Sequence, residues 1–303
     1  MQEIATKKFN WIDIKNPTQK DINFLKKEYR FHDLNLEDCL SSIQRPKVDV
    51  QTDHIFIVLH FPRYFKTTKR MMSSEVNIFL GEDYLITLHS GDLKPLNSFY
   101  DQLKKDPKTL EELSRKGSAM VLYELISQLF EYCFPIIDKI SERLSYVDNV
   151  MFEERPSSIV PEIAKLNQEI ISFRKIISPQ RRVVLDLEDR IKPFLVKGND
   201  LYFDDITDMI EKIWGSLENF KEVSEALQST HDSYVTHRLN EGIKILTVFS
   251  AILLPLTLIT GYYGMNVHGL PLADHPLSAT LIFGSMLLLV GLTLYFFKKK
   301  DIL

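Results

Sequence analysis

The sequence predicts an α+β membrane protein in which a large soluble part precedes two C-terminal transmembrane helices. Residues 245–263 and 276–297 contain no charged side chain, and each run has about the 20 residues that a helix needs to cross a bilayer. Strand-like and helix-like runs alternate over the first hundred residues, and helical spacing of apolar residues dominates afterwards. We therefore expect an α/β domain, a helical domain and a membrane hairpin.

The first 117 residues are expected to form one cytoplasmic α/β domain. The residues Thr18–Asp21 resemble the capping start of a helix that runs to about Tyr29. The turn residues Gly81–Asp83 join two short apolar runs that read as strands. The elements expected here are strands at residues 9–14, 54–61, 75–80 and 84–89, and helices at residues 18–29 and 34–41.

Residues 118–241 are expected to form a helical domain and a stalk. One helix is predicted from residue 118 to about residue 152 and another from 159 to 191, with a turn at 155–158 between them. After Asp200 no proline occurs until Pro255, so a single helix is expected from about residue 201 to 259, roughly 90 Å long. Such a helix could be a static stalk or could transmit displacement, and its length favours neither.

Basic residues predict the orientation in the membrane. Arg238 and Lys244 precede the first span, Lys298–Lys300 follow the second, and the loop between the spans has no lysine or arginine. By the positive-inside rule, both termini are cytoplasmic and the loop is external. The predicted parts are transmembrane helices at 242–263 and 276–297, an external loop at 264–275 and a basic tail at 298–303.

Several functional classes are disfavoured. The net charge of −4 argues weakly against nucleic-acid binding, and the two cysteines, Cys39 and Cys133, form no CxxC pair. No phosphate-binding loop or hydrolase motif is present. We therefore expect no enzyme and no organic cofactor.

One face of the first span carries several small or polar residues. They recur at alternating spacings of three and four, which places them on one stripe. Such a stripe could line a pore, but small residues in membranes more commonly mark helix packing. The stripe consists of Asn240, Ile243, Thr247, Ser250, Leu254, Thr257 and Gly261.

The residues Tyr263-Gly264-Met265-Asn266, at the end of the penultimate span, resemble the signature of the CorA family of magnesium transporters. Supporting segments are 36–40, 44–48, 243–247 and 255–261. The resemblance covers essentially the whole chain. It implies a homopentameric funnel in the lipid bilayer, and passive, gated Mg²⁺ influx. Since no organellar presequence is visible, the plasma membrane is expected, which is the inner membrane in a Gram-negative cell.

The resemblance also implies the roles of particular residues. Gly264, Met265 and Asn266 would form the selectivity filter, with Asn266 ringing the outer mouth. Mg²⁺ gives up its waters reluctantly, and neutral amide oxygens can accept hydrogen bonds from those waters. The implied pore-lining and gating residues are Asn240, Ile243, Leu246, Thr247, Ser250, Leu254 and Thr257, with the gate near Ile243 and Leu246.

Acidic residues of the soluble part are candidate Mg²⁺ sensors. By resemblance, internal Mg²⁺ would bridge Asp38 and Asp205 of adjacent subunits and hold the channel closed, with Glu37 beside Asp38. From the residues alone, these carboxylates are more typical of solvated helix ends. Mg²⁺ is thus expected as both transported and regulatory ion.

Two alternatives remain open. Asp274 is the only carboxylate between Val267 and Asp274, whereas many magnesium-transporting members carry an acidic loop there, and the loop is similar to that of the zinc-transporting branch. Zn²⁺, Co²⁺ or Ni²⁺ would then be the cargo, although the loop histidines His268 and His275 are more typical of solvent-facing residues than of metal ligands. The alternative of another class is a non-conducting membrane tether.

Overall fold

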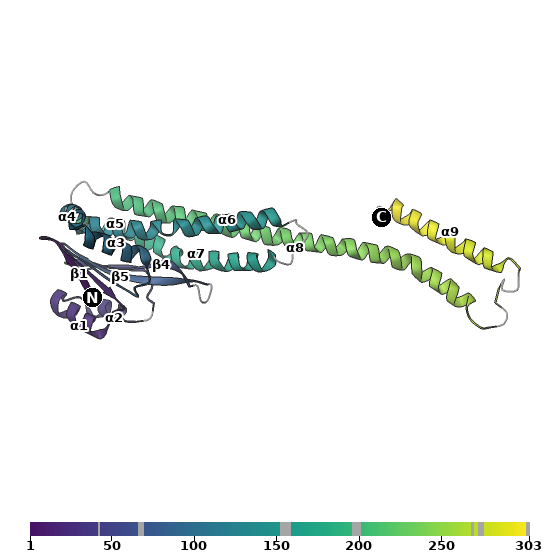
Figure 1. The fold of residues 1–303 in the computed structure, drawn as a ribbon, viewed down its shortest axis with the longest axis horizontal. Helices are drawn as coiled ribbons and strands as arrows, with labels where there is room; N and C mark the ends of the chain where they lie inside the picture. Colours follow the sequence, from purple (N-terminus) through teal and green to yellow (C-terminus); the bar gives the residue numbers. More distant parts are fainter. Residues whose placement is uncertain are drawn as a thin grey trace. The chain divides into compact units, whose positions relative to one another are not determined.

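The computed structural model describes residues 1–41, 43–65, 70–151, 159–195, 201–267, 270–271 and 276–300. The chain divides into two compact units, Met1–Leu227 and Gln228–Leu303. Figure 1 shows the order of the elements along the chain. Helix α8 (Leu201–Tyr263) belongs to both units because it continues through the boundary.

A mixed β-sheet forms the centre of the first unit. Within the described residues it has six strands in the order β1-β2-β6-β5-β4-β3, in which only the β2–β6 pair is parallel. The expected strands at 9–14, 54–61, 75–80 and 84–89 are confirmed, and the middle two are longer than expected. The edge strands β1 and β3 were not expected, because they are four residues long and mostly not buried. The strands are β1 (Gln2–Ala5), β2 (Asn10–Lys15), β3 (Lys47–Val50), β4 (His54–Phe65), β5 (Arg70–Gly81) and β6 (Tyr84–His89).

Helices cover both faces of this sheet. The short helices α1 (Gln19–Tyr29) and α2 (Asp33–Asp38) lie on one face, and the remaining helices of the unit lie on the other (Figure 1). Side chains of one strand alternate between the faces: Phe56 and Val58 belong to the smaller core under α1 and α2, while Ile55 and Ile57 belong to the larger core. The helices on the larger side are α3 (Lys94–Lys105), α4 (Pro107–Arg115), α5 (Ser118–Glu131), α6 (Phe134–Val150), α7 (Ile159–Arg190), the 3₁₀ turn η2 (Lys192–Phe194) and the first part of α8.

The expectation of one helix from residue 118 to 152 is wrong. The segment forms two helices, α5 and α6, which are separated at Tyr132 and Cys133. Pro135 explains the break, because proline has no N–H to donate to residue 131 and its ring clashes with that carbonyl inside a helix. In its place the N–H groups of Ile136 and Ile137 both donate to the Cys133 oxygen at 3.1 Å.

A buried glutamine ties α7 to β4. The Gln180 side chain is fully buried; its Nε2 donates to the His60 oxygen at 2.6 Å, and its Oε1 accepts from the His60 N–H at 2.7 Å. Strand β3 pairs with β4 only as far as Val58. Beyond that residue, β3 no longer pairs with this edge of β4. The buried main-chain N–H and C=O groups there need another partner, and the Gln180 amide supplies it.

We expect Gln180→Met to destabilise the protein by about 2 to 4 kcal/mol. The substitution keeps the side-chain volume but leaves the buried N–H and C=O of His60 without partners. Denaturant unfolding of the detergent-solubilised protein, followed by tryptophan fluorescence, measures the loss. Gln19→Met on the exposed surface of α1 is the control, with an expected change within about 0.5 kcal/mol. Equal losses for the two variants would contradict the assigned role of Gln180.

The second unit contains the last part of α8 and helix α9 (Ser278–Lys299). By length and composition, three helical segments of the described chain could cross a membrane: Ser118–Val150, Tyr202–Tyr263 and Ser278–Lys299. More than half of the apolar window in the first segment is buried, whereas the windows in the other two are not buried at all. Packing in the core of the first unit therefore accounts for the apolar character of α5 and α6. The apolar surfaces of α8 and α9 require another environment.

Candidate ion pathway and regulatory carboxylates

The predicted stripe on α8 is exposed in the single chain. The stripe residues Leu254 and Ile243 are 69% and 59% exposed, and Leu246, the other implied gate residue, lies beside the stripe and is 66% exposed. The hydroxyls of Thr247 and Thr257 donate to main-chain oxygens of Ile243 and Leu253 at 2.7 and 2.9 Å. Since the hydroxyl hydrogens are used within the helix, the threonine oxygens are left as hydrogen-bond acceptors.

In the part of α8 that carries the stripe, a set of half-buried residues lies on a different face. Val248, Ile252, Pro255 and Ile259 are half-buried and recur at spacings of four and three. At about 100° per residue, they lie roughly 150° around the helix from the stripe. Ser250 is the exception, because it belongs to the stripe and is itself half-buried. The rest of the stripe thus lies on the more exposed face of the helix.

The Gly-Met-Asn residues follow the last turn of α8. The Gly264 N–H donates to the Thr260 oxygen at 2.8 Å, and the Met265 N–H donates to the Tyr262 oxygen at 3.4 Å. A β-carbon at position 264 would lie 2.8 Å from the Thr260 oxygen, so this close backbone approach explains why glycine is needed there.

Asn266 follows directly and is exposed. Among the described residues, its carboxamide has no hydrogen-bond partner. Met265 is 52% exposed. The turn therefore presents the side chains of Met265 and Asn266 at the end of the uncharged stripe. His268 and His275 lie outside the described residues.

The structure places Asp38 and Asp205 on opposite sides of the sheet. Asp38 ends α2, next to the smaller core, and Asp205 lies in the first turns of α8, next to the larger core. Glu37 is exposed. Among the described residues, no three His, Cys, Asp or Glu side chains form a group that could hold a metal. One chain therefore does not bring these carboxylates together.

Each of the two aspartates has a partner within the chain. Asp38 Oδ2 lies 2.8 Å from Lys47 Nζ. Asp205 Oδ2 accepts a hydrogen bond from the Tyr123 hydroxyl at 2.9 Å. Burial, together with this bond to Asp205, raises the pKa of Tyr123. The sequence indicated neither contact, because each partner lies on a different element from its aspartate.

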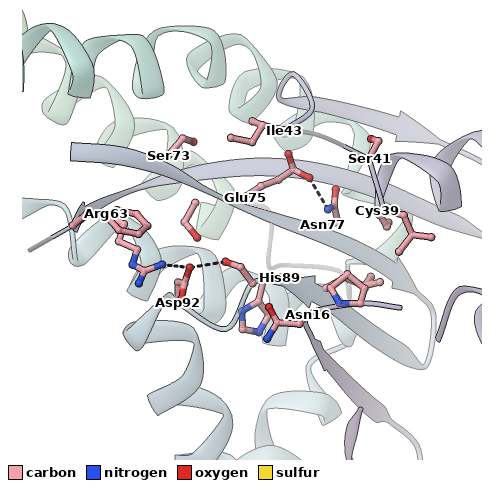
Figure 2. A pocket seen from close by; sticks show the side chains of 16 residues that line it. Asn16, Cys39, Ser41, Ile43, Arg63, Ser73, Glu75, Asn77, His89 and Asp92 are labelled. Atoms are coloured by element: carbon pink, nitrogen blue, oxygen red, sulfur yellow. Dashed lines mark hydrogen bonds and ion pairs between the residues drawn. The ribbon is translucent and has the colours of Figure 1, made fainter. Parts of the chain in front are cut away.

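A cavity of about 380 Å³ adjoins the end of α2. Figure 2 shows Glu75 and Asn77 on its wall, near Cys39, Ser41 and Ile43. Asn77 Nδ2 donates to Glu75 Oε1 at 2.8 Å. At the other end of the cavity, Asp92 interacts with Arg63 and Ser90 (Figure 2).

Glu75 anchors the segment that leads from α2 into β3. Its Oε2 accepts a hydrogen bond from the main-chain N–H of Gln44 at 2.6 Å. Burial alone would raise the pKa of Glu75, but the His60 ring, whose Nε2 lies 3.5 Å from Glu75 Oε2, and hydrogen bonds from Asn77 and Gln44 hold that pKa below its usual value. Glu75 therefore stays ionised and helps to position the chain just before Lys47. No sequence motif marked this residue.

Comparisons with known proteins agree with this architecture. A sequence model of the CorA-like Mg²⁺ transporter protein family matches residues 6–299. The Bacillus subtilis protein YfjQ is 29% identical over 296 residues, covering 95% of this chain and 88% of that protein. The cobalt/magnesium transport protein CorA of Thermotoga maritima is 27% identical over 292 residues, covering 96% of this chain and 82% of that protein.

A solved structure has the same fold. The CorA magnesium transporter from Methanocaldococcus jannaschii superposes with a TM-score of 0.82 at 22% sequence identity, covering 98% of this chain and 93% of that one. The family match extends over nearly all of the sequence, from the α/β domain to the end of the membrane hairpin. The chain therefore belongs to the CorA-like Mg²⁺ transporter family, whose members are membrane ion transporters and not enzymes.

Proposed function

We propose that this protein is a passive, gated channel that admits Mg²⁺ through the plasma membrane. The observation that carries the proposal is the place of Asn266: an exposed carboxamide at the end of an uncharged, outward-facing stripe on α8. Several copies of α8 around one axis would turn the stripe into a pore lining and the Asn266 side chains into a ring. The number of copies that we propose is five.

The chemistry of the proposed ring suits a hydrated ion. Mg²⁺ holds six oxygens in a strict octahedron and loses water slowly. Carboxylates would bind the ion firmly, whereas the neutral amide oxygens of Asn266 accept hydrogen bonds from its coordinated waters and release it easily. Below the ring, the oxygens of Thr257 and Thr247 offer acceptors of the same kind.

Gating would take place at apolar positions on the stripe and beside it. Leu254, Leu246 and Ile243 can form constrictions that exclude water, which is a sufficient barrier to an ion. Asn240 would add a polar ring at the inner end. With both termini in the cytoplasm, the membrane potential supplies about 4.6 kcal/mol per 100 mV for inward movement of a divalent ion. No other energy source is needed.

We propose that internal Mg²⁺ closes the channel by bridging Asp38 of one copy and Asp205 of the next, with Glu37 nearby. The opposite placement of the two aspartates in one chain supports a site between copies. A bridging divalent ion offsets the repulsion between the two carboxylates. When internal Mg²⁺ falls, that repulsion returns and favours an open arrangement.

Co²⁺ is the second candidate cargo. The Thermotoga maritima relative is named a cobalt/magnesium transport protein. In this chain, Asp274 is the only carboxylate in the loop after Asn266. A filter that binds the water shell rather than the metal itself would admit hydrated ions of similar size and charge. Uptake of Zn²⁺ and Ni²⁺ is therefore measured in the same experiment.

Metal uptake into proteoliposomes tests the proposal. The purified protein is reconstituted, an inside-negative potential is imposed, and entry of Mg²⁺, Co²⁺, Ni²⁺ and Zn²⁺ is followed with internal indicator dyes. We expect Mg²⁺ and Co²⁺ entry that grows with the potential. Protein-free vesicles and vesicles without a potential are the controls. Absence of flux for every ion would favour a non-conducting tether.

A further inference from the structure

Lys47 holds the proposed regulatory carboxylate Asp38 within the chain. Lys47 is the first residue of β3, and its Nζ lies 2.8 Å from Asp38 Oδ2 and 2.7 Å from Asp49 Oδ2. The Lys47 and Asp38 side chains are 33% and 23% exposed. The ammonium also lies 5.2 Å from the centre of the Phe56 ring. These contacts fix the lysine in one place instead of leaving it to move freely in solvent.

The ammonium of Lys47 keeps its charge. Burial alone would lower the pKa of Lys47, but the hydrogen bonds to Asp38 and Asp49 outweigh it and raise that pKa above its usual value. The positive charge lies 2.8 Å from one oxygen of the carboxylate that a bridging Mg²⁺ would use.

We infer that Lys47 competes with internal Mg²⁺ for Asp38 and so sets the Mg²⁺ concentration at which the channel closes. The inference rests on the proposed regulation through Asp38 and Asp205. A Mg²⁺ ion that approaches Asp38 must displace the ammonium or share the carboxylate with it, and two cations at one carboxylate repel each other. Lys47 is shared between Asp38 and Asp49, so without Mg²⁺ these three groups keep a formal charge of −1, which still repels Asp205 of the next copy.

The two sides of the proposed site differ in this respect. Asp205 accepts a hydrogen bond from the neutral hydroxyl of Tyr123, which does not repel a cation. Asp38 instead pairs with the positively charged ammonium of Lys47. The three carboxylates around the proposed site carry a formal charge of −3, and Lys47 reduces it to −2. These carboxylates are Asp38, Asp49 and Asp205. Lys47 therefore lowers the affinity for a divalent ion and delays closure until internal Mg²⁺ is higher.

Neutralising Lys47 tests the inference. We expect Lys47→Met, which keeps the apolar stem beside Phe56, to lower the internal Mg²⁺ concentration that halves uptake into proteoliposomes by about two- to fivefold, since part-exposed ion pairs are weak. Lys47→Arg keeps the charge and should remain near the wild-type midpoint. Lys26→Met is the matched control, because Lys26 pairs with Asp33 at the other end of α2 at 2.6 Å. This variant should leave the midpoint unchanged.

A second readout is independent of flux. Mg²⁺ raises the thermal unfolding midpoint of the detergent-solubilised protein if it binds the native assembly. Lys47→Met should shift that titration to lower Mg²⁺ by the same factor. An unchanged or higher midpoint in both assays would overturn the inference, as would equal shifts in Lys47→Met and Lys26→Met.

An Asp38→Asn background separates this inference from the proposal beneath it. If Asp38→Asn leaves inhibition by internal Mg²⁺ intact, the proposed regulatory site is wrong. If Asp38→Asn weakens inhibition but Lys47→Met does not move the midpoint, the regulatory site stands and the competition by Lys47 is wrong. A Lys47→Met shift that persists in the Asp38→Asn background also overturns it, because the lysine would then act elsewhere.

Discussion

Replacing Asn266 with alanine is expected to lower the initial rate of Mg²⁺ uptake by roughly 10- to 100-fold. The change removes from every copy the carboxamide that would accept a hydrogen bond from a coordinated water. A hydrogen bond to a charged partner contributes about 1.5 to 3 kcal/mol. The turn itself should survive, because its main-chain hydrogen bonds are made by Gly264, Met265 and Val267. Proteoliposome uptake under an imposed potential measures the loss.

Val267→Ala is the matched control for that experiment. Val267 lies next to Asn266 in the same turn and is also exposed. Truncating Val267 therefore tests whether any side-chain truncation in this turn lowers uptake. We expect its uptake to stay within about twofold of wild type, since exposed substitutions away from a site are nearly neutral. If the Asn266→Ala protein is correctly inserted and takes up Mg²⁺ at the wild-type rate, Asn266 does not act as the filter that we propose.

Local patterns in the sequence predicted most of the individual elements. Runs of apolar residues gave the four central strands, and the long interval without proline after Asp200 predicted the start of α8. The prediction failed where one residue overrides a pattern. The apolar periodicity from residue 118 continues past Pro135, although the helix is interrupted just before it. The short strands β1 and β3 were missed because edge strands with few buried residues carry little periodicity.

In the candidate site, too, the features set by local sequence could be predicted, whereas the contacts made by the tertiary fold could not. The position of Asn266 directly after the last turn of α8 could be predicted from local sequence alone, and its role as a filter stays a prediction from the family resemblance. The common face of Leu254 and the other stripe residues also follows from helical spacing. The contacts of Asp38 with Lys47 and of Asp205 with Tyr123 could not be predicted, because each joins elements that only the tertiary fold brings together. Ser250 belongs to the stripe by spacing, yet it is half-buried.

Replacing both Asp38 and Asp205 with asparagine is expected to raise the internal Mg²⁺ concentration needed for half inhibition by about tenfold or more. Asparagine keeps the size of each side chain but removes both negative charges that would hold the bridging ion. Loss of two part-exposed charge contacts, each worth about 1 kcal/mol, corresponds to a shift of this size. Uptake measured over a series of internal Mg²⁺ concentrations gives the midpoint.

Asp33→Asn combined with Asp204→Asn is the matched control. These exposed aspartates lie on the same two helices, α2 and α8, and Asp33 also pairs with a lysine. The control removes the same total charge from the same elements, so a general electrostatic effect on Mg²⁺ would appear in both double variants. Equal midpoints for the two would mean that the feedback depends on the overall charge of the cytoplasmic part. A shift confined to Asp38 and Asp205 would assign the feedback to these two carboxylates, because only their removal would weaken the hold of Mg²⁺ on the closed arrangement.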